Sequence, residues 1–167
     1  MLSEKDYEKI AKEALRNYSI ICKDLLYLGK SDNVTFRVNT SDGNLKYLIK
    51  IHISTGSSKT KDVIESELIW LEALARDTNL IIPNPVRNLE GGLITEISII
   101  NNEEKLNVTL HNWVNGEVLG RQPTSHETTS LALLMAALHK HSIQWNIPEN
   151  FKTPITIRII YSHHLAN

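Results

Sequence analysis

Apolar and polar residues alternate along this chain with the period of a β-strand in five stretches. The clearest is residues 46–52, where alternation places Tyr47, Ile49 and Ile51 on one face and leaves Lys50 on the other. The other predicted strands are residues 20–28, 34–38, 93–99 and 106–113. Short polar turns join the first three strands, so we expect these strands to form an antiparallel meander.

Three further stretches repeat apolar residues at the spacing of an α-helix: residues 3–18, 61–76 and 125–142. Ser3 is the expected N-cap of the first helix, and either Thr124 or Ser125 caps the third. In the second helix, the apolar stripe formed by Ile64, Leu71 and Leu74 also includes Glu67. The pattern therefore predicts a carboxylate within a face that should be buried.

The order of these elements predicts an α+β fold, with about five antiparallel strands and one helix across them, followed by a helical part. Strand character ends near Trp113, and helix character begins after Pro123. The expected divisions are an N-terminal helix at 1–19, a strand-rich lobe at 20–113, a connector at 114–117, a helical segment at 118–154 and a tail at 155–167. The apolar stripe of the last helix, at Leu131, Leu134, Met135 and Leu138, is expected to pack in a core.

Composition excludes several classes of protein. Hydrophobic residues make up 41% of the 167 residues and charged residues 22%, with a net charge of −1. This charge gives no electrostatic basis for binding nucleic acid or an anionic membrane. The only cysteine, Cys22, has apolar neighbours that predict a buried thiol, and it cannot form an internal disulfide. No signal peptide or membrane-spanning run is evident, so we expect a cytoplasmic protein.

Two motifs do not meet the requirements of the sites that they suggest. Gly29-Lys30-Ser31 resembles the end of a phosphate-binding P-loop, but the required glycine five positions earlier is Asp24. Among the histidines, His139 and His141 are two positions apart on a predicted helix and therefore point to different faces. Another pair, His163 and His164, has no cysteine or carboxylate nearby, so a zinc site is not expected.

The pair formed by Lys50 and Glu67 is the strongest candidate for chemistry. A half-buried ammonium and a half-buried carboxylate each cost several kcal/mol unless they pair. A strand lysine paired with a helix glutamate is the device with which kinases hold the phosphates of ATP. The alternative is a lysine that extends to solvent and a glutamate at the rim of its helix. The loop at 29–33 could present backbone N–H groups to a phosphate, or it could be an ordinary polar turn.

With these pieces in place, the chain resembles the aminoglycoside phosphotransferase family, a group with a protein-kinase-like fold that includes homoserine, choline and fructosamine kinases. The resemblance follows the order and spacing of short segments across residues 20–154. These segments are 31–38 (SDNVTFRV), 47–52 (YLIKIH), 67–74 (ELIWLEAL), 82–86 (IPNPV), 112–117 (NWVNGE), 138–142 (LHKHS) and 151–154 (FKTP).

The resemblance implies a kinase-like N-terminal lobe and the beginning of a helical second lobe. Lys50 would hold the α- and β-phosphates of ATP, and Glu67 would orient that lysine. Ser31 to Asn33 would lie over the phosphates. The stretch Asn112, Trp113 and Val114 would begin a hinge, extending through the connector at 114–117, whose backbone holds adenine.

The sequence departs from the family in its second half. Phosphoryl transfer in these enzymes uses a catalytic-loop aspartate, a following asparagine and a second aspartate that binds Mg²⁺. The last aspartate here is Asp77, before the hinge. We therefore expect a truncated ATP-dependent small-molecule phosphotransferase that has no catalytic residue and no Mg²⁺ ligand, binds ATP weakly and is inactive alone.

Two other classes remain open. One is a regulatory or interaction module, in which a degenerate kinase lobe pairs with a second lobe supplied by another chain. The other is a plain α+β interaction domain in which Lys50 and Glu67 are ordinary surface residues. The phosphate acceptor is not readable from this part of the chain, because the second lobe selects it in this family.

Overall fold

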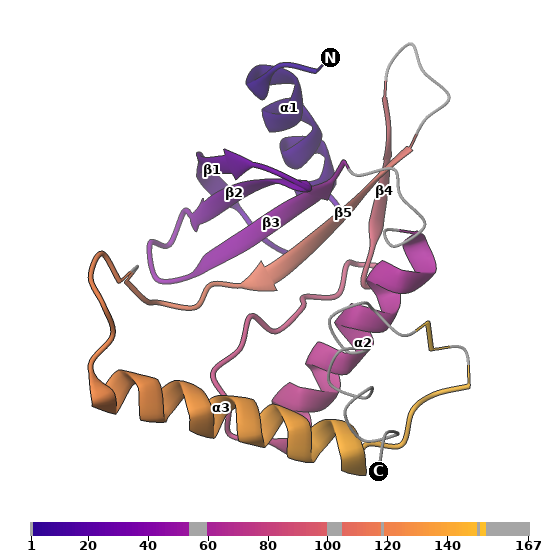
Figure 1. Ribbon diagram of the computed structural model, residues 1–167. Coiled ribbons are helices and arrows are strands. Elements are labelled where there is room, and N and C mark those ends of the chain that lie inside the picture. The colour runs from indigo at the N-terminus through magenta and orange to yellow at the C-terminus, as the bar shows by residue number, and fades with distance from the viewer. Residues whose placement is uncertain (1, 54–59, 100–104, 118, 150, 153–167) are drawn as a thin grey trace. The chain divides into compact units, whose positions relative to one another are not determined.

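The computed structural model describes residues 2–53, 60–99, 105–117, 119–149, 151 and 152 (Figure 1). The tail at 155–167, with His163 and His164, and the end of the FKTP segment lie outside these residues. The described elements are α1 (Glu4–Leu15), β1 (Cys22–Lys30), β2 (Asn33–Thr40), β3 (Lys46–His52), α2 (Lys61–Asp77), β4 (Thr95–Ser98), β5 (Lys105–Asn112) and α3 (Ser125–Gln144). Strands and helices thus form an α+β fold, as predicted.

The chain divides into two compact units. We call Met1–Lys61 with Pro83–Trp113 the sheet unit, and Asp62–Ile82 with Val114–Asn167 the helical unit. The sheet unit contains α1 and all five strands, whereas α2, apart from Lys61, and α3 belong to the helical unit.

The sheet has the strand order β1-β2-β3-β5-β4, and each neighbouring pair is antiparallel. The predicted meander of the first three strands is confirmed. Its second turn contains Gly43, whose φ of 72° lies in the left-handed region that glycine adopts readily. The sheet therefore places β3, with Lys50, at its centre.

One face of the sheet is covered by α1 and forms the core of the sheet unit (Figure 1). Phe36, Ile49 and Ile51 are almost fully buried there against helix residues such as Ile10. The predicted alternation in β3 is confirmed, because Ile49 and Ile51 are buried while Lys50 is only half-buried on the opposite face. The helix begins at a complete capping box between Ser3 and Asp6, as expected.

The helical unit is held by contacts near the C-terminal ends of its two helices. Trp70 and Leu74 of α2 form a small cluster with Leu138, Trp145 and other apolar residues. Beside it, His141 of α3 lies 3.1 Å from Asp77 through its Nε2 atom, and its side chain is 7% exposed. The opposite orientations expected for His139 and His141 are confirmed, because His139 is exposed.

The first half of α3 extends beyond α2 (Figure 1). Three of its apolar residues are exposed, Leu131 (58%), Leu133 (67%) and Leu134 (37%), and so is the next residue along the helix, Met135 (42%). The prediction of a core stripe is therefore wrong for this half, and only Leu138 of the predicted stripe packs in the cluster. The physical reason is that apolar residues lie on several sides of α3, while α2 meets only its C-terminal part.

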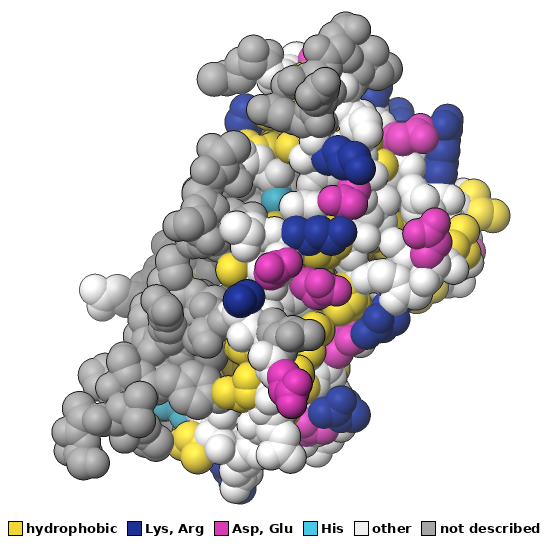
Figure 2. Space-filling model, turned by 90° about the vertical axis from the view of Figure 1, so that its right-hand side faces the viewer, with side chains coloured by type: hydrophobic (Ala, Val, Ile, Leu, Met, Phe, Trp, Pro, Cys, Tyr) yellow, Lys and Arg dark blue, Asp and Glu magenta, His cyan; other side chains and the backbone are white. Residues whose placement is uncertain are grey.

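Charges of both signs are interspersed on the face shown in Figure 2, where Lys and Arg side chains alternate with Asp and Glu. Among the described residues, no helix combines the length and apolarity needed to cross a membrane.

Candidate functional site

The face of the sheet opposite α1 carries side chains in rows, because residues paired across antiparallel strands point to the same side. The first row consists of Leu26, Arg37, Leu48 and His111. The second row consists of Thr35, Lys50 and Thr109. The third row consists of Asn33, His52 and Asn107. Lys50 therefore lies in the middle row of this face, between a first row that contains two leucines and a third row that is polar.

Three side chains beside Lys50 form a continuous polar chain. His52 Nε2 lies 3.1 Å from Thr109 Oγ1, and Thr109 Oγ1 lies 3.1 Å from His111 Nε2. The other ring nitrogen of His111, Nδ1, lies 3.1 Å from the carbonyl oxygen of Pro83. Thr109 and His111 are 0% and 1% exposed. Burial, with a smaller effect of the Lys50 charge, lowers the pKa of His111 to about 4.

The loop between β1 and β2 contains the predicted phosphate-side residues Ser31 and Asn33. The backbone N–H of Ser31 donates to the carbonyl oxygen of Asn33 at 2.9 Å. The backbone carbonyl oxygen of Asp32 accepts from the backbone N–H of Ile53 at 3.4 Å. One backbone donor of this loop is thus used within the loop itself. Asn33 is the first residue of β2 and pairs with His52, so it lies at the third row.

The predicted hinge begins where β5 ends. Asn112 donates its backbone N–H to Asn84 at 2.9 Å, and Trp113 donates to Lys46 at 3.2 Å. The guanidinium of Arg37 lies 5.7 Å from the centre of the Trp113 ring, a cation–π contact. The end of β5 is therefore held from both sides, while the next predicted hinge residue, Val114, begins the second part of the helical unit.

Glu67 belongs to α2 in the helical unit, where it is exposed between buried Ser66 and Leu68. The prediction that Glu67 lies within the buried stripe is wrong. The buried face of α2 advances by four residues from Ile64 to Leu68, which leaves position 67 outside it. The pairing of Glu67 with Lys50 stays a prediction.

Sequence reasoning missed His111, Thr109 and Arg37 as neighbours of Lys50. Their alternation within β2 and β5 is visible in the sequence, but their places opposite Lys50 and Leu48 depend on strand register. A short polar turn or loop of unknown geometry does not fix that register. The one usable signal was the buried-strand pattern of 106–113, which contains a threonine and a histidine among apolar residues.

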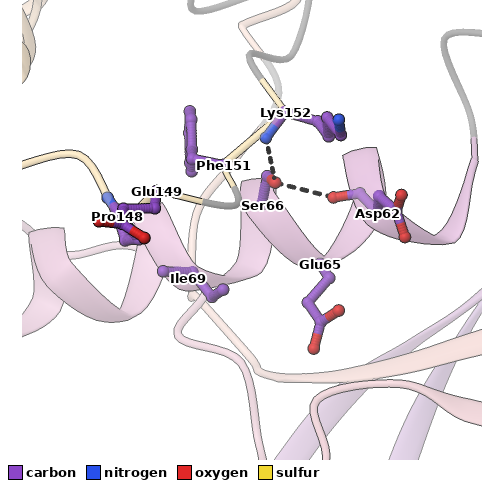
Figure 3. A pocket seen from close by; sticks show the side chains of 8 residues that line it. All are labelled: Asp62, Glu65, Ser66, Ile69, Pro148, Glu149, Phe151 and Lys152. Atoms are coloured by element: carbon purple, nitrogen blue, oxygen red, sulfur yellow. Dashed lines mark hydrogen bonds between the residues drawn. The ribbon is translucent and has the colours of Figure 1, made fainter.

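A separate cavity of about 860 Å³ lies in the helical unit (Figure 3). It is lined by Asp62, Glu65, Ser66 and Ile69 of α2 and by Pro148, Glu149, Phe151 and Lys152. The Ser66 hydroxyl donates to the Asp62 carbonyl and accepts from the Lys152 N–H, both at 2.8 Å. None of the predicted site residues lines this cavity. Within the part of the chain that the structure describes, no group of three metal-ligating side chains is present.

Comparisons with known proteins identify the fold. A scan of protein-family models and a search of curated proteins found no match. Among solved structures, a microcompartment-associated aminopropanol kinase matches with a TM-score of 0.70 and 27% identity, over 87% of this chain and 44% of the kinase. An amicoumacin kinase in complex with AMP-PNP, Ca²⁺ and Ami matches with a TM-score of 0.67 and 16% identity, over 88% of this chain and 43% of that kinase.

The chain thus spans less than half the length of either kinase. The resemblance predicted from the sequence segments is confirmed as a likeness of fold: this chain has the aminoglycoside phosphotransferase-like kinase fold, in a part that contains the five-stranded sheet and three helices.

Proposed function

We propose that this chain is the nucleotide-binding part of an ATP-dependent small-molecule kinase, and that the 167 residues bind ATP weakly without transferring its phosphate. The observation that carries the proposal is the half-buried Lys50 on the central strand of the sheet, on the face opposite α1, in a fold shared with kinases. One of those kinases was solved with the ATP analogue AMP-PNP.

The row order suits a nucleotide. Leu26 and Leu48 of the first row offer apolar surface for a flat base, and Leu26 is 46% exposed. The predicted hinge at Asn112 directly follows His111 of the same row. Lys50 stands one row further, about 7 Å along the strands. A base near the first row would therefore place its phosphates within reach of the Lys50 ammonium.

Charge supports the same direction of binding. The Lys50 ammonium would attract phosphate oxygens. Buried His111 is neutral, so Lys50 is the positively charged side chain of this pair. Ser31 and Asn33 lie beyond Lys50, at the end of the face to which the phosphates would extend. Glu67 would orient Lys50 in the full kinase arrangement.

Phosphate transfer needs groups that these residues do not supply. No aspartate follows Asp77 in this sequence, and the described residues contain no group of three metal-ligating side chains. Since phosphoryl transfer depends on positioning and charge stabilisation, a nucleotide bound at Lys50 alone is not activated. A catalytic aspartate and the metal ligands would have to come from residues outside this sequence.

Nucleotide titration tests the proposal. Isothermal calorimetry with AMP-PNP should detect weak binding to the wild-type chain, and Lys50→Ala should abolish it. Lys105→Ala is the matched control, because Lys105 is exposed at the start of β5 and should not affect binding. Equal binding by wild type and Lys50→Ala would show that the site assignment is wrong.

A phosphate-transfer assay tests the second part of the proposal. With ATP, Mg²⁺ and a panel of small amino alcohols, the chain should release no ADP above the level of Lys50→Ala. Lys50-dependent transfer by these residues alone would contradict the assignment of catalysis to groups elsewhere.

The exposed α3 favours a second candidate, a lobe that functions with a separately encoded half. Five large apolar side chains of α3 are exposed, namely Leu131, Leu133, Leu134, Met135 and Ile143, and exposed apolar surface of this extent marks an interaction site. Co-expression with a chain carrying a histidine-glycine-aspartate loop should give a stable complex that transfers phosphate. Failure of such chains to co-purify would leave the first proposal, a nucleotide-binding part that transfers no phosphate by itself, as the better one.

A further inference from the structure

The polar chain beside Lys50 has a defined direction, which follows from its last acceptor. The carbonyl oxygen of Pro83 can only accept, so His111 must donate to it from Nδ1. A neutral imidazole carries one proton, and His111 is neutral down to a pH of about 4. Its Nε2 is therefore an acceptor, which receives the hydroxyl proton of Thr109.

The direction continues to His52. Because the Thr109 hydroxyl has only one proton and gives it to His111, its oxygen can only accept from His52. His52 therefore donates from Nε2. The whole chain runs from His52 through Thr109 and His111 to Pro83, and every bond in it depends on the Thr109 hydroxyl or on the Nδ1–H tautomer of His111.

We propose that this hydrogen-bonded chain makes His111 a positioning residue for the base end of the nucleotide site, with Thr109 as the group that fixes its ring. The inference rests on the proposed nucleotide binding. It assigns to His111 a fixed ring plane and tautomer in the first row, beside Leu48 and directly before Asn112.

The position of His111 explains why its effect falls on the base and not on the phosphates. His111 forms a bridge with Pro85, and Asn112 and Leu110 on either side of it bond to the Asn84–Val86 backbone. In an extended strand, the N–H and C=O of one residue point to the same side. The Asn112 carbonyl therefore faces the side on which Asn84 lies. A displaced His111 ring would move both the surface below a base and the start of the hinge, while Lys50 sits on another strand.

Histidine spectroscopy gives a test that needs no variant. Long-range ¹⁵N–¹H spectra of the wild-type chain at pH 7 should show His111 as the Nδ1–H tautomer. AMP-PNP should then shift the His111 ring signals, whereas inorganic tripolyphosphate, which lacks a base, should leave them in place. The opposite tautomer, or equal shifts with both ligands, would overturn the proposal.

Binding measurements on two Thr109 variants give the second test. Thr109→Val keeps the shape of the side chain and removes the hydroxyl, whereas Thr109→Ser keeps the hydroxyl. Thr109→Val should weaken AMP-PNP binding by about fivefold or more, while its affinity for tripolyphosphate stays within about twofold. Thr109→Ser should bind both ligands like the wild type.

The outcomes separate this inference from the proposed function. If wild type binds neither ligand, the nucleotide site itself is refuted and the role of His111 with it. If wild type binds AMP-PNP but Thr109→Val binds it equally well, only the positioning role is refuted. A loss of affinity for both ligands in Thr109→Val would indicate a general structural effect and would also refute it.

Discussion

Neutral His111 beside charged Lys50 shows how the sheet can hold two basic side chains on neighbouring strands. A protonated imidazole at this place would be buried and would repel the ammonium, and both effects lower the pKa of His111 to about 4. His52 lies at the other end of the same polar chain. The folded protein therefore excludes a proton that the unfolded chain would bind.

This exclusion makes stability depend on pH. The unfolded histidine titrates near 6.5 and the folded one near 4, so the unfolding free energy should fall as the pH drops between these values. The loss from this group should reach about 3 kcal/mol and level off below pH 4. Urea unfolding at pH 7, 6, 5 and 4 measures it. In His111→Gln this part of the slope should disappear, and an unchanged slope would contradict the assignment.

The apolar neighbours of Cys22 predicted a buried thiol, but Cys22 is only partly buried. The thiol is half-buried at the start of β1, and the adjacent Ile21 is 78% exposed. Partial burial, followed by the nearby Asp24 carboxylate, raises the pKa of the thiol.

A raised pKa predicts slow alkylation, because the thiolate is the reactive form. Iodoacetamide at pH 8 should modify the folded chain more slowly than it modifies free cysteine, and the rate should rise in urea. Mass spectrometry follows this cleanly, since Cys22 is the single cysteine. Reaction of the folded chain as fast as free cysteine would refute the shift.

The N-terminal turn of α3 is stabilised by its own side chains. Thr124 and Glu127 form a complete capping box, and Arg121 binds both carboxylate oxygens of Glu127 at 2.8 and 2.9 Å. These contacts, Arg121 first, lower the pKa of Glu127 to about 2. The N-cap is Thr124, which decides between the two residues that the sequence allowed.

Thr124→Ala should therefore destabilise the start of α3 by about 1 kcal/mol. Hydrogen exchange at the amides of the first turn measures the effect locally. Thr128→Ala is the matched control, because Thr128 bonds only to the Thr124 carbonyl one turn back, and alanine favours helix. Equal exchange in both variants would show that the cap contributes nothing.

Local patterns were sufficient for most of the elements. Alternation, capping residues and turn glycines lie within a few positions of one another. They placed the Ser3 cap and the β3 strand correctly and narrowed the cap of α3 to Thr124 or Ser125. They failed where tertiary contact decides the outcome. Whether Leu134 is buried depends on what covers α3, and whether His111 adjoins Lys50 depends on register, neither of which a local pattern contains.

The two compact units differ in how completely their apolar side chains are buried. The sheet unit has a closed core under α1, whereas the helical unit leaves half of its longest helix exposed. Apolar surface of this kind drives association in solution. The arrangement therefore predicts self-association unless another lobe covers α3.

Replacing Leu133 and Leu134 together by Gln should reduce concentration-dependent association in sedimentation velocity, without loss of fold. Leu138→Gln is the contrasting variant, because Leu138 packs against Trp70 and Leu74 and its change should destabilise the helical unit. If the double variant associates as strongly as wild type, the exposed leucines are not the cause.

The cover that α1 gives to the sheet sets a limit on shortening the chain. Tyr7, Ile10 and Leu15 seal one side of the strands, and Tyr18 extends this layer with a hydroxyl that accepts from Thr95 of β4. A version beginning at residue 20 would open Phe36 and Ile49 to water and invite aggregation through the bared strands. A fusion partner should therefore be attached on the N-terminal side of Ser3, with α1 kept intact, and should not replace α1.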